Sequence, residues 1–560
     1  MMFKEWVQAT PPPAWVLEPL VRECGLHPLV AGILHRRGYE TPEDVHRFLQ
    51  VKLAGLRNPF ELRHMAEAVQ IVIDALKSAR RIVILGDYDV DGITGTTLLL
   101  EFFEACGCKN LDFFIPNRLE HGYGLTAKSA EVLLSMNPEV VITVDNGITA
   151  AAEVEQLQAS GITTVITDHH LPGAELSGGI VVNPNHPECP YPFKKLSGCG
   201  VALKLALGVR KVLREQGWWT TDRPEPNLLD SMDLAALGTI ADVVPLVDEN
   251  RIMVQFGLQV MNSKPRLGVT AMRSLRKTDK VVARTVGFQF APLLNASGRL
   301  KDASLGVELL RCQDDESARI IVAELNRTNE ERRSVEAEMR EAAFRIAATQ
   351  RDRHSFVIAH PEFHEGVNGI VAARLVDRYH KPTIILSQNG DSLKGSARSI
   401  PELHVKQALE SCADLLDRFG GHAAAAGCSL SLARLDEFSA RFEAFCRATL
   451  PELPTPKLEI EGALDDSAIS DQLVEQLEWL QPFGEGNPEP FFVVQAPDHE
   501  FQTMKERHVK WKLNGSVDII GWNLAEAFEQ QPPSQLAVTL GFNEYRGRRS
   551  VQMLIQEVQA

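Results

Sequence analysis

Between residues 60 and 210, short apolar segments alternate with helical patterns, and this alternation constrains the fold more than any other feature. Five apolar or β-branched segments are expected as strands: Arg81–Leu85, Leu111–Ile115, Val140–Val144, Thr163–Thr167 and Ile180–Val182. The stretches between them have helical spacing: Glu61–Ser78, Gly95–Cys106, Lys128–Met136 and Ala150–Ala159. Continuous apolar strands separated by helices predict a parallel sheet covered on both faces. Ligands of such sheets bind at the carboxyl ends of the strands.

The remaining sequence divides into further parts, and the length of 560 residues allows three to four domains at roughly 150 residues each. Residues 305–350 have no proline and predict one long charged helix, which is typical of a bridge between domains. Strands are expected again at Ser355–Ala359 and Thr383–Ser387, and three prolines between 451 and 456 mark a linker. The predicted order is a helical cap (1–58), an α/β lobe (59–300), a connecting helix (301–350), a second α/β lobe (351–452) and a small β-barrel (453–560).

Composition limits the classes of function. The net charge is −16, from 58 basic and 74 acidic residues, which argues against coating nucleic acid by bulk attraction. It leaves room for a narrow basic channel beside an acidic, metal-binding centre. The nine cysteines include no Cys-x-x-Cys pair, so neither a disulfide framework nor a structural zinc site is predicted. No apolar run approaches the roughly 20 residues of a membrane span, and no secretory signal is recognisable, so a soluble cytoplasmic protein without membrane contact is expected.

The most informative local pattern follows the first expected strand. Asp87, Asp89 and Asp91 alternate along the chain and are followed by Gly92, where the chain can bend. Three such carboxylates can surround a hard cation at a strand-to-helix turn, although a solvated acidic turn or helix cap has the same composition. A calcium-binding EF-hand is excluded, because Thr96–Leu100 supplies no carboxylate at the twelfth loop position.

Two other expected strands also end in polar side chains. Asp145, in Asp-Asn-Gly, follows Val140–Val144, and Asp168-His169-His170 follows Thr163–Thr167. Either motif alone is commonly structural, but the ends of parallel strands meet at one edge of the sheet. Asp242 lies in an otherwise apolar stretch, where a buried carboxylate needs a partner. Together these side chains predict a site for Mn²⁺, with Mg²⁺ as the alternative.

Two further sets of residues have the composition of nucleic-acid contacts. Arg118 follows Leu111–Ile115, and Tyr123 lies five residues later; phosphate capture and base stacking compete with a surface arginine and a turn tyrosine. Basic residues interleave with aromatic ones near the C-terminus, which suits single-stranded nucleic acid or, alternatively, a solvated strand face. These residues are Lys505, Arg507, His508, Lys510, Trp511 and Lys512, followed by Tyr545, Arg546, Arg548 and Arg549.

These motifs, in this order, resemble those of the DHH phosphoesterase superfamily, and within it the bacterial RecJ exonucleases. The resemblance covers about residues 60–560 and rests on Asp-Asn-Gly, Asp-His-His and five further segments: Gly86–Gly92, Pro116–Arg118, Gly122–Gly124, Thr239–Pro245 and Gly420–Gly427. It implies an α/β fold in which lobes of the DHH and DHHA1 types are joined by a long helix and followed by an OB-like barrel. One departure is Leu85, where many relatives have a histidine four residues before the first metal-binding aspartate. Asp87 is the candidate replacement ligand.

The resemblance also implies roles for individual residues. Asp89 would bind one metal ion, Asp91, His169 and Asp242 the second, and Asp145 both. His170 would contact the substrate or tune the nucleophile, with Asp168 orienting the histidines. Substrate contacts would come from Arg118, Tyr123, Arg299, Ser396, Arg398, Gly420, Gly421 and His422. Without the resemblance, Gly420–Gly427 would be interpreted as a tight loop followed by a closely packed helix.

The function implied is a 5′→3′ exonuclease on single-stranded DNA that uses two Mn²⁺ or Mg²⁺ ions, releases 5′-mononucleotides and serves recombination and repair. A strand with a 5′ end is the expected partner, a single-strand-binding protein and a helicase are further candidates, and a monomer is expected. Two alternatives are a phosphodiesterase of short oligonucleotides or cyclic dinucleotides and a catalytically silent DNA-binding protein. The basic-aromatic C-terminal region argues against the first, and the retained metal ligands argue against the second.

Overall fold

The computed structural model describes residues 4–118, 120–173, 176–465, 468–496, 501–513, 517–530, 532–545 and 547–559. The chain forms two compact units. The first comprises residues 1–4, 58–242 and 256–456, and the second comprises residues 5–57, 243–255 and 457–560. Among the helices so described, none is both long enough and apolar enough to cross a membrane.

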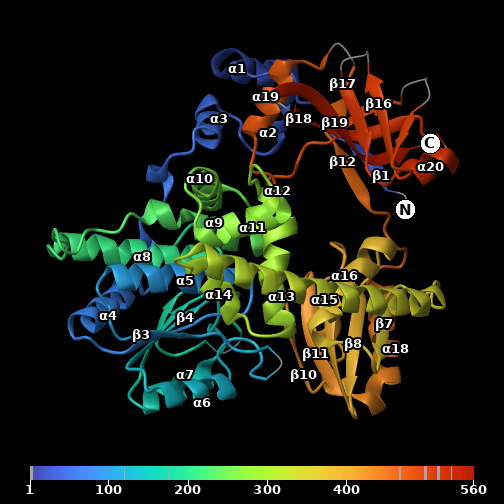
Figure 1. The fold of residues 1–560 in the computed structure, drawn as a ribbon. Helices are drawn as coiled ribbons and strands as arrows, with labels where there is room; N and C mark the ends of the chain where they lie inside the picture. The colour runs from blue at the N-terminus through green and yellow to red at the C-terminus, as the bar shows by residue number, and fades with distance from the viewer. Residues whose placement is uncertain are drawn as a thin grey trace. The chain divides into compact units, whose positions relative to one another are not determined.

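A five-stranded parallel sheet forms the first lobe of the first unit (Figure 1), which confirms the alternation expected from the sequence. The strand order is β3-β2-β4-β5-β6. The bounds are Ile82–Leu85 (β2), Leu111–Phe114 (β3), Val140–Val144 (β4), Thr163–Thr167 (β5) and Ile180–Val182 (β6). Central strands are fully buried because helices cover both faces. On one face α6 (Ala127–Met136) and α7 (Ala151–Ala159) share a core with β2, β4 and β5.

Further helices complete this lobe. α5 (Val90–Ala105) packs against α8 (Gly198–Glu215) and α9 (Met232–Ala241), and α4 (Met65–Lys77) packs against α8. The chain then continues through helices of varied length. These are α10 (Asp248–Ser263), α11 (Leu267–Arg276), α12 (Ala283–Thr285), a π-helical turn (Val286–Phe290), α13 (Ala291–Leu300) and α14 (Ser304–Arg311).

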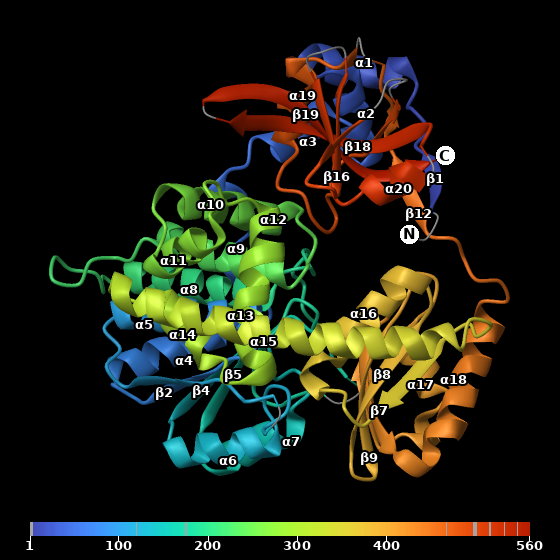
Figure 2. The same cartoon turned by 45° about the vertical axis from the view of Figure 1, so that its right-hand side comes forward.

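The connecting segment is not one helix, as its composition predicted, but two. α14 ends at Arg311, and α15 runs from Asp315 to Ala348. The chain leaves the helical conformation at Cys312, and Asp314 caps α15 by accepting a hydrogen bond from the Ser317 amide at 2.8 Å. α15 packs against α11 and α13 and then against α16 (Asn368–Tyr379), so it joins the two lobes of the first unit (Figures 1 and 2).

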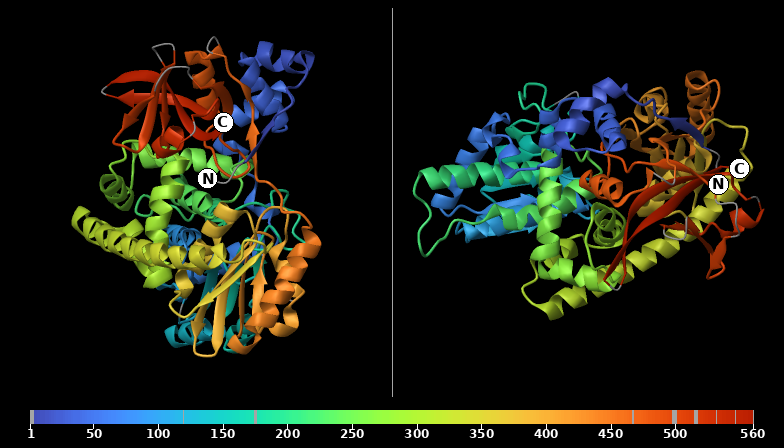
Figure 3. Two further views of the ribbon diagram at one scale, coloured as in Figure 1. Left: turned by 90° about the vertical axis from the view of Figure 1, so that its right-hand side faces the viewer. Right: turned by 90° about the horizontal axis from the view of Figure 1, so that it is seen from above.

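The second lobe is built on a mixed sheet of order β10-β11-β9-β8-β7. Its strands are Phe356–His360 (β7), Thr383–Asn389 (β8), Ser392–Arg398 (β9), Arg418–Gly421 (β10) and Ala425–Ser431 (β11). α15 and α16 share a core with β7 and β8, and α17 (Val405–Glu410) and α18 (Leu435–Thr449) share another with β8, β9 and β11 (Figure 3). The interpretation of 420–427 as a loop and a helix was wrong. Gly420 and Gly427 instead oppose each other in an antiparallel pair, since small residues carry no helical periodicity.

The second unit contains a seven-stranded sheet of order β13-β14-β18-β19-β17-β16-β15. The strands are Gly462–Ala463 (β13), Phe492–Gln495 (β14), Gln502–Met504 (β15), His508–Leu513 (β16), Val517–Gly521 (β17), Gln535–Tyr545 (β18) and Arg548–Gln559 (β19). Among the described strands, β13 and β15 do not pair, so the sheet does not close into a barrel, although it is compatible with the OB-like fold that was expected. α20 (Ala525–Gln530) and α19 (Asp471–Trp479) pack with it.

The N-terminal helices also belong to this unit. α1 (Ala14–Cys24), α2 (Pro28–Arg36) and α3 (Pro42–Leu49) share one hydrophobic core with the C-terminal sheet. β1 (Glu5–Gln8) pairs in parallel with β12 (Lys457–Ile460). The segment expected as a cap at 1–58 is therefore not separate, because so short a segment buries its apolar side chains only against a larger partner.

Candidate metal centre and nucleotide cavity

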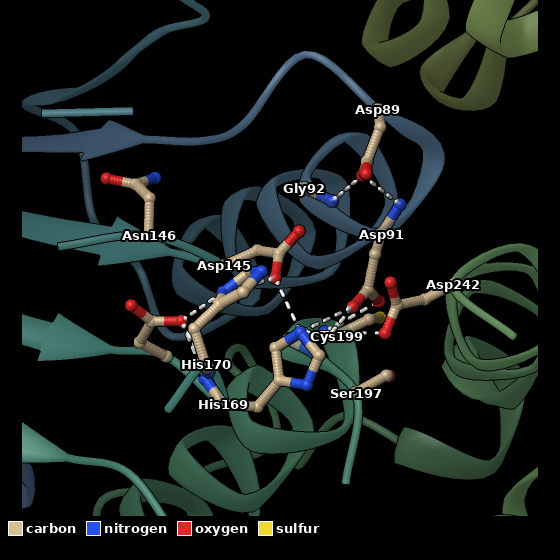
Figure 4. Close-up of polar contacts among 12 residues, drawn as sticks. Asp89, Asp91, Gly92, Asp145, Asn146, His169, His170, Ser197, Cys199 and Asp242 are labelled. Carbon is tan, nitrogen blue, oxygen red and sulfur yellow. Dashed lines mark hydrogen bonds and ion pairs between the residues drawn. The ribbon is translucent and has the colours of Figure 1, made fainter. Parts of the chain in front are cut away.

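The carboxyl ends of β2, β4 and β5 and the end of α9 bring the acidic motifs together (Figure 4). Asp89 is the N-cap of α5, and its Oδ1 accepts hydrogen bonds from the amides of Asp91 at 2.9 Å and Gly92 at 3.2 Å. This cap turns the chain so that Asp87 and Asp91 are buried on either side of it. A Cβ at Gly92 would lie 2.5 Å from the backbone of Asp87, so only glycine allows this turn.

Asp145 has a left-handed backbone, with φ of 65°. Such a conformation is uncommon for a residue other than glycine and is found at functional sites. The turn is held by Asn146, whose Nδ2 donates to the carbonyl oxygens of Leu85 at 3.2 Å and Val144 at 2.9 Å. The side chain of Asn146 thus ties β2 to β4, and the carboxylate of Asp145 is fixed between the two strand ends.

Three overlapping groups of side chains each have their potential ligand atoms within 4.8 Å of one another. Asp145 and His169 each belong to two groups, which places them at the middle of the site. The groups are Asp87, Asp89 and Asp145; Asp91, His169 and Asp242; and Asp145, His169 and His170. The structure therefore brings together all the acidic residues and histidines that the sequence proposed as ligands.

The carboxylates of this cluster destabilise one another's charged forms. Burial, followed by the charge of Asp89, raises the pKa of Asp91 to about 7. Burial also raises the pKa of Asp87, Asp145 and Asp242 well above the usual range, and the neighbouring carboxylates add to the effect. Crowded carboxylates of this kind favour a bound cation, which would remove the repulsion.

His169 offers an unprotonated nitrogen to these carboxylates. Burial, followed by the charge of the neighbouring His170, lowers its pKa to about 3. Its Nε2 lies 3.0 Å from Asp145 Oδ1 and 3.5 Å from Asp242 Oδ2. Yet His169 Nε2, Asp145 Oδ1 and Asp87 Oδ1 are buried without a hydrogen-bond partner among the described residues. A lone pair facing carboxylate oxygens fits a divalent metal ion with mixed nitrogen and oxygen ligands.

Asp168 orients the second histidine. Its Oδ1 accepts from the amides of His169 and His170 and, at 2.8 Å, from His170 Nδ1; its Oδ2 accepts from Ile148 N at 2.9 Å. Burial alone would raise the pKa of Asp168, but these hydrogen bonds and the histidine charges lower it to about 2. Burial likewise lowers the pKa of His170, but the bond to Asp168 and nearby carboxylates outweigh it and raise the value to about 9. His170 therefore carries a positive charge at neutral pH.

The N-terminus of α8 contributes a part of the site that the sequence reasoning missed. The amides of Gly198 and Cys199 donate to the carboxylate of Asp91 at 2.5 and 3.0 Å. Ser197 caps this helix by accepting from Gly200 N at 3.1 Å. A Cβ at Gly198 would lie 2.5–2.7 Å from side-chain atoms of Asp145. The capping pattern of Ser197 before an apolar helix was the available signal, but it did not reveal which carboxylate the amides bind.

A cavity of about 410 Å³ adjoins the centre between the two lobes of the first unit. Arg118 and Tyr123 line it from the first lobe, and Ser396, Gly420 and Gly427 from the second. The hydroxyl of Tyr123 donates to the Asp145 carbonyl at 3.1 Å and lies 3.3 Å from His170 Nε2. The residue as a whole is 47% exposed. Tyr123 thus touches both the metal cluster and the cavity.

Arginines from three elements approach the same region. Burial, followed by the charges of Arg118, Arg332 and Arg398, lowers the pKa of Arg299 to about 10. Burial and the charge of Arg118 lower the pKa of Arg398. Arg299 Nη1 donates to the Gly366 carbonyl at 3.1 Å. The mutual repulsion of these guanidinium groups favours an anion among them.

The glycine motif of the second lobe reaches the first lobe through His422. Its ring lies 6.3 Å from that of His170, with an interplanar angle of 16°. Burial, followed by the charge of His170, lowers the pKa of His422. Gly420 and Gly421, at the end of β10, directly precede it, so the end of this strand lies near His170.

One of the C-terminal residues expected to contact nucleic acid, Trp511, is not at the surface. Trp511 is buried against Phe501 and Phe528 in the core of the second unit, so its ring is not available for base stacking. It alternates along β16 with Lys510 and Lys512, which therefore face away from the core. Lys510 pairs with Asp518 at 3.1 Å. The sequence did not point to Trp522, which directly follows β17, is 54% exposed and contacts His508.

The other basic residues of this region differ in their surroundings. Lys505, Arg507, Lys512 and Arg548 are exposed. Arg549 packs over the ring of Phe542 and pairs with Glu475 and Glu478 on α19. Arg546 lies outside the described residues, as does the side chain of Tyr545.

Comparison with known proteins agrees with this geometry. Residues 81–239 match the DHH family, N-terminal domain; residues 353–448 match the DHHA1 domain; and residues 460–557 match the RecJ OB domain. The chain is 38% identical over 563 residues to the "Single-stranded-DNA-specific exonuclease RecJ" of Dickeya dadantii, covering 95% of this chain and 96% of that protein.

Two solved structures from Thermus thermophilus are similar along nearly the whole chain. RecJ in complex with Mn²⁺ gives a TM-score of 0.85 at 30% identity and covers 99% of this chain and 79% of that one. RecJ in complex with Mg²⁺ gives 0.77 at 28% identity, covering 99% and 78%. The matched domains, the full-length identity and the shared fold lead to one conclusion: this chain belongs to the RecJ family.

Proposed function

We propose that this protein is a metal-dependent exonuclease that degrades single-stranded DNA from the 5′ end and releases 5′-mononucleotides. The observation that carries the proposal is the position of Asp145. Asp145 belongs to two groups of potential ligand side chains. Its backbone carbonyl accepts a hydrogen bond from the hydroxyl of Tyr123, and Tyr123 lines a cavity together with Arg118. The RecJ proteins of Dickeya and Thermus support the substrate and the metal through their names, which specify single-stranded DNA, Mn²⁺ and Mg²⁺.

The donor set suits two ions, Mn²⁺ or Mg²⁺. Asp87, Asp89 and Asp145 would hold one, and Asp91, His169 and Asp242, again with Asp145, the other. In this assignment Asp87 takes the place of the histidine that Leu85 replaces. Two such ions about 3.5–4 Å apart lower the pKa of water and stabilise the oxygens that enter and leave during phosphodiester hydrolysis.

Two side chains beside the metal ligands, those of His170 and Tyr123, would position the DNA strand. Asp168 accepts a hydrogen bond from His170 Nδ1 and so orients the ring, which would contact the scissile phosphate. Tyr123 holds the His170 ring from the other side and offers its exposed face to a base. Both residues act beside the ligands, and neither belongs to the two proposed ligand sets.

The guanidinium groups of Arg118, Arg299 and Arg398 would bind the 5′ end of the DNA strand. If the bond to the 3′ oxygen breaks, each cycle leaves a strand with a 5′ phosphate, which the enzyme must bind again. Arg118, Arg299 and Arg398 supply the charge for this phosphate, and Ser396 adds a donor in the cavity wall. This site would set the polarity, because only a terminal nucleotide places its phosphate there while the next bond lies at the metal centre.

A glycine substitution tests the cavity wall. Gly420 has no positive φ, and a Cβ there would meet nothing within 4 Å, so the protein itself does not require glycine at this position. Glycine weakens a strand unless a ligand approaches the backbone closely. Gly420→Ala is therefore expected to leave the melting temperature unchanged or higher, while the KM for single-stranded DNA rises about tenfold or more, since a methyl group would occupy the substrate's space.

The matched control is Gly541→Ala, at a strand glycine of the second unit with equally open surroundings. That variant should retain the wild-type KM. Equal KM values for Gly420→Ala and the wild type would show that β10 does not contact the substrate.

The second unit would add affinity along the strand. Lys505, Arg507 and Lys512 supply exposed charge, and Trp522 supplies an exposed ring in place of Trp511. A single-strand-binding protein and a helicase as partners, a monomeric state and a cytoplasmic location remain predictions from the sequence.

The direct test of this function compares substrates under Mn²⁺. A long single strand should be degraded, whereas a blunt duplex should resist, and chelation of the metal should stop release. Faster turnover of a trinucleotide than of a long strand would favour an oligonucleotide phosphodiesterase instead. Equal degradation of blunt duplex and single strand would contradict the proposed specificity.

A further inference from the structure

The chain passes from the first unit to the second directly after Asp242. Asp242 is the C-cap of α9, and its Oδ2 lies 3.5 Å from His169 Nε2 in the metal centre (Figure 4). Residues 243–255 already belong to the second unit. This proposed metal ligand therefore has a helix of the first unit on its amino side and a segment of the second unit on its carboxyl side, so both can affect its position.

A glycine-containing loop of the second unit, residues 483–487, holds this segment through the backbone. The amide of Leu246 donates to the carbonyl of Glu485 at 2.7 Å. The side chain of Leu246 is buried, and a Cβ at Gly484 would lie only 2.7 Å from it. The loop thus approaches Leu246 more closely than a residue with a side chain at position 484 would allow.

Gly486 packs against the residue before Leu246. It has a left-handed backbone, with φ of 70°, and a Cβ there would lie 2.9 Å from the Cβ of Pro245. A residue with a side chain would be strained at this position and would displace Pro245. The carbonyl of Pro245 also accepts a hydrogen bond from Asn250 Nδ2 at 2.9 Å. Pro245 is therefore held in one position, three residues after Asp242.

The loop is itself firmly held within the second unit. Asn487 is buried, and its Nδ2 donates to the carbonyls of Leu480 and Pro482, both at 2.8 Å. Its Oδ1 accepts from Arg37 Nη1 at 2.5 Å. Arg251, in the same segment as Pro245, donates from Nη1 to the carbonyl of Leu480 at 3.1 Å. Hydrogen bonds of this buried network join the loop and the segment to one framework.

The backbone between Asp242 and Pro245 is strained. Val243 has φ of 59°, which is a genuine outlier for a β-branched residue. Its side chain is 65% exposed, so burial of that side chain does not account for the conformation. Strain of this kind persists where the surrounding structure imposes it. Here the Asp242 amide donates to the Gly238 carbonyl of α9 at 2.9 Å, and the loop holds Pro245 at the other end.

We propose that Gly486 is a positioning residue for Asp242 and acts through Pro245. It sets the affinity for the metal ion that Asp242 would share with Asp91 and His169. The inference rests on the proposed function and deepens it, because it makes one of the two metal sites dependent on a loop of the unit that carries the C-terminal sheet. Residues that orient a ligand from outside the coordination shell typically change metal affinity about 10- to 100-fold.

The test measures metal binding separately from turnover. Mn²⁺ is titrated into the metal-free full-length protein. Calorimetry gives the number and affinity of the ions, and electron paramagnetic resonance distinguishes paired from single Mn²⁺ ions. The wild type should bind two ions. Gly486→Ala should weaken one of them about tenfold or more and leave the other unchanged, because only one ligand is displaced.

The matched control is Gly25→Ala. Gly25 also lies in the second unit and has φ of 66°, but a Cβ there would meet nothing within 4 Å. This variant brings a comparable backbone strain and should retain both Mn²⁺ affinities. Asp242→Asn shows whether the effect passes through the ligand. It should weaken the same ion, and adding Gly486→Ala to it should weaken that ion no further.

A milder variant covers the case in which Gly486→Ala does not fold. In Gly484→Ala the new Cβ meets only the end of the Leu246 side chain, so the same ion should weaken by a smaller factor.

Three outcomes would overturn the proposal: unchanged Mn²⁺ affinities in the folded loop variants, equal weakening of both ions, or additive losses when Gly486→Ala is combined with Asp242→Asn. Failure of the proposed function is distinguishable, since it would appear as absent nucleotide release by the wild type while both Mn²⁺ ions are bound.

Discussion

Replacing Asp145 by asparagine should reduce nucleotide release by about 10³-fold or more, because its carboxylate groups with Asp87 and Asp89 and also lies 3.0 Å from His169 of the second proposed ligand set. The amide keeps the shape of the carboxylate but lacks its charge, so DNA binding in EDTA should remain. Single-turnover rates under saturating Mn²⁺ measure the effect. The matched control is Asp112→Asn on β3, the edge strand of the same sheet, where a largely accessible carboxylate pairs with Arg81; this variant should retain full activity.

The same variant should have a higher melting temperature than the wild type when metal is absent. Burial and neighbouring carboxylates raise the pKa of Asp145 in the folded protein, so its ionisation destabilises the fold. The gain should be present at neutral pH, where the unfolded chain ionises readily, and should shrink as the pH falls toward the ordinary aspartate range. Wild-type turnover by Asp145→Asn, or a lower melting temperature of the metal-free variant, would contradict the assigned position of this carboxylate.

Replacing Gly198 by alanine should be almost as damaging, although glycine has no side chain to lose. The new Cβ would lie 2.5–2.7 Å from atoms of the Asp145 side chain, closer than real contacts allow. The carboxylate must then move, while the Gly198 amide still donates to Asp91. A displacement of about 1 Å in such a site costs roughly 10²-fold in rate. We expect that loss in turnover, together with weaker Mn²⁺ binding by calorimetry.

Cys199→Ala is the control for Gly198→Ala. It lies next along α8 and keeps the amide that donates to Asp91 at 3.0 Å, but it removes an atom rather than adding one. Its turnover should stay near that of the wild type. Undiminished turnover and Mn²⁺ affinity in Gly198→Ala would mean that Asp145 does not need its observed position.

The sequence predicted the metal cluster because parallel strands impose a simple rule. β4, β5 and β6 have the bounds expected, and the residues that follow parallel strands must meet at one edge. Asp242 could be included because a carboxylate in an apolar segment needs a partner. The contribution of α8 could not be predicted in the same way. Its donors are backbone amides, which leave no signature in the identity of Gly198 or Cys199.

The other differences between the expected and the observed structure have separate physical reasons. Trp511 alternates with Lys510 and Lys512 along β16, and successive side chains of a strand point to opposite faces, so the ring lies on the core side. The expectation that Trp511 stacks on bases relied on composition and ignored this alternation. The break before α15 depends on a single capping bond of Asp314. The shared core of the N-terminal helices and the C-terminal sheet joins segments more than 400 residues apart, which no local pattern reveals.

The central claim is that this protein removes nucleotides from the 5′ end of single-stranded DNA with the help of metal. The most direct measurement is a time course with Mn²⁺ on two single strands, one labelled at the 5′ end and one at the 3′ end. We expect immediate release of labelled mononucleotide from the 5′-labelled strand, while the 3′ label persists in long products. Release that begins at the 3′ label, or tight binding of both strands without any release, would contradict it.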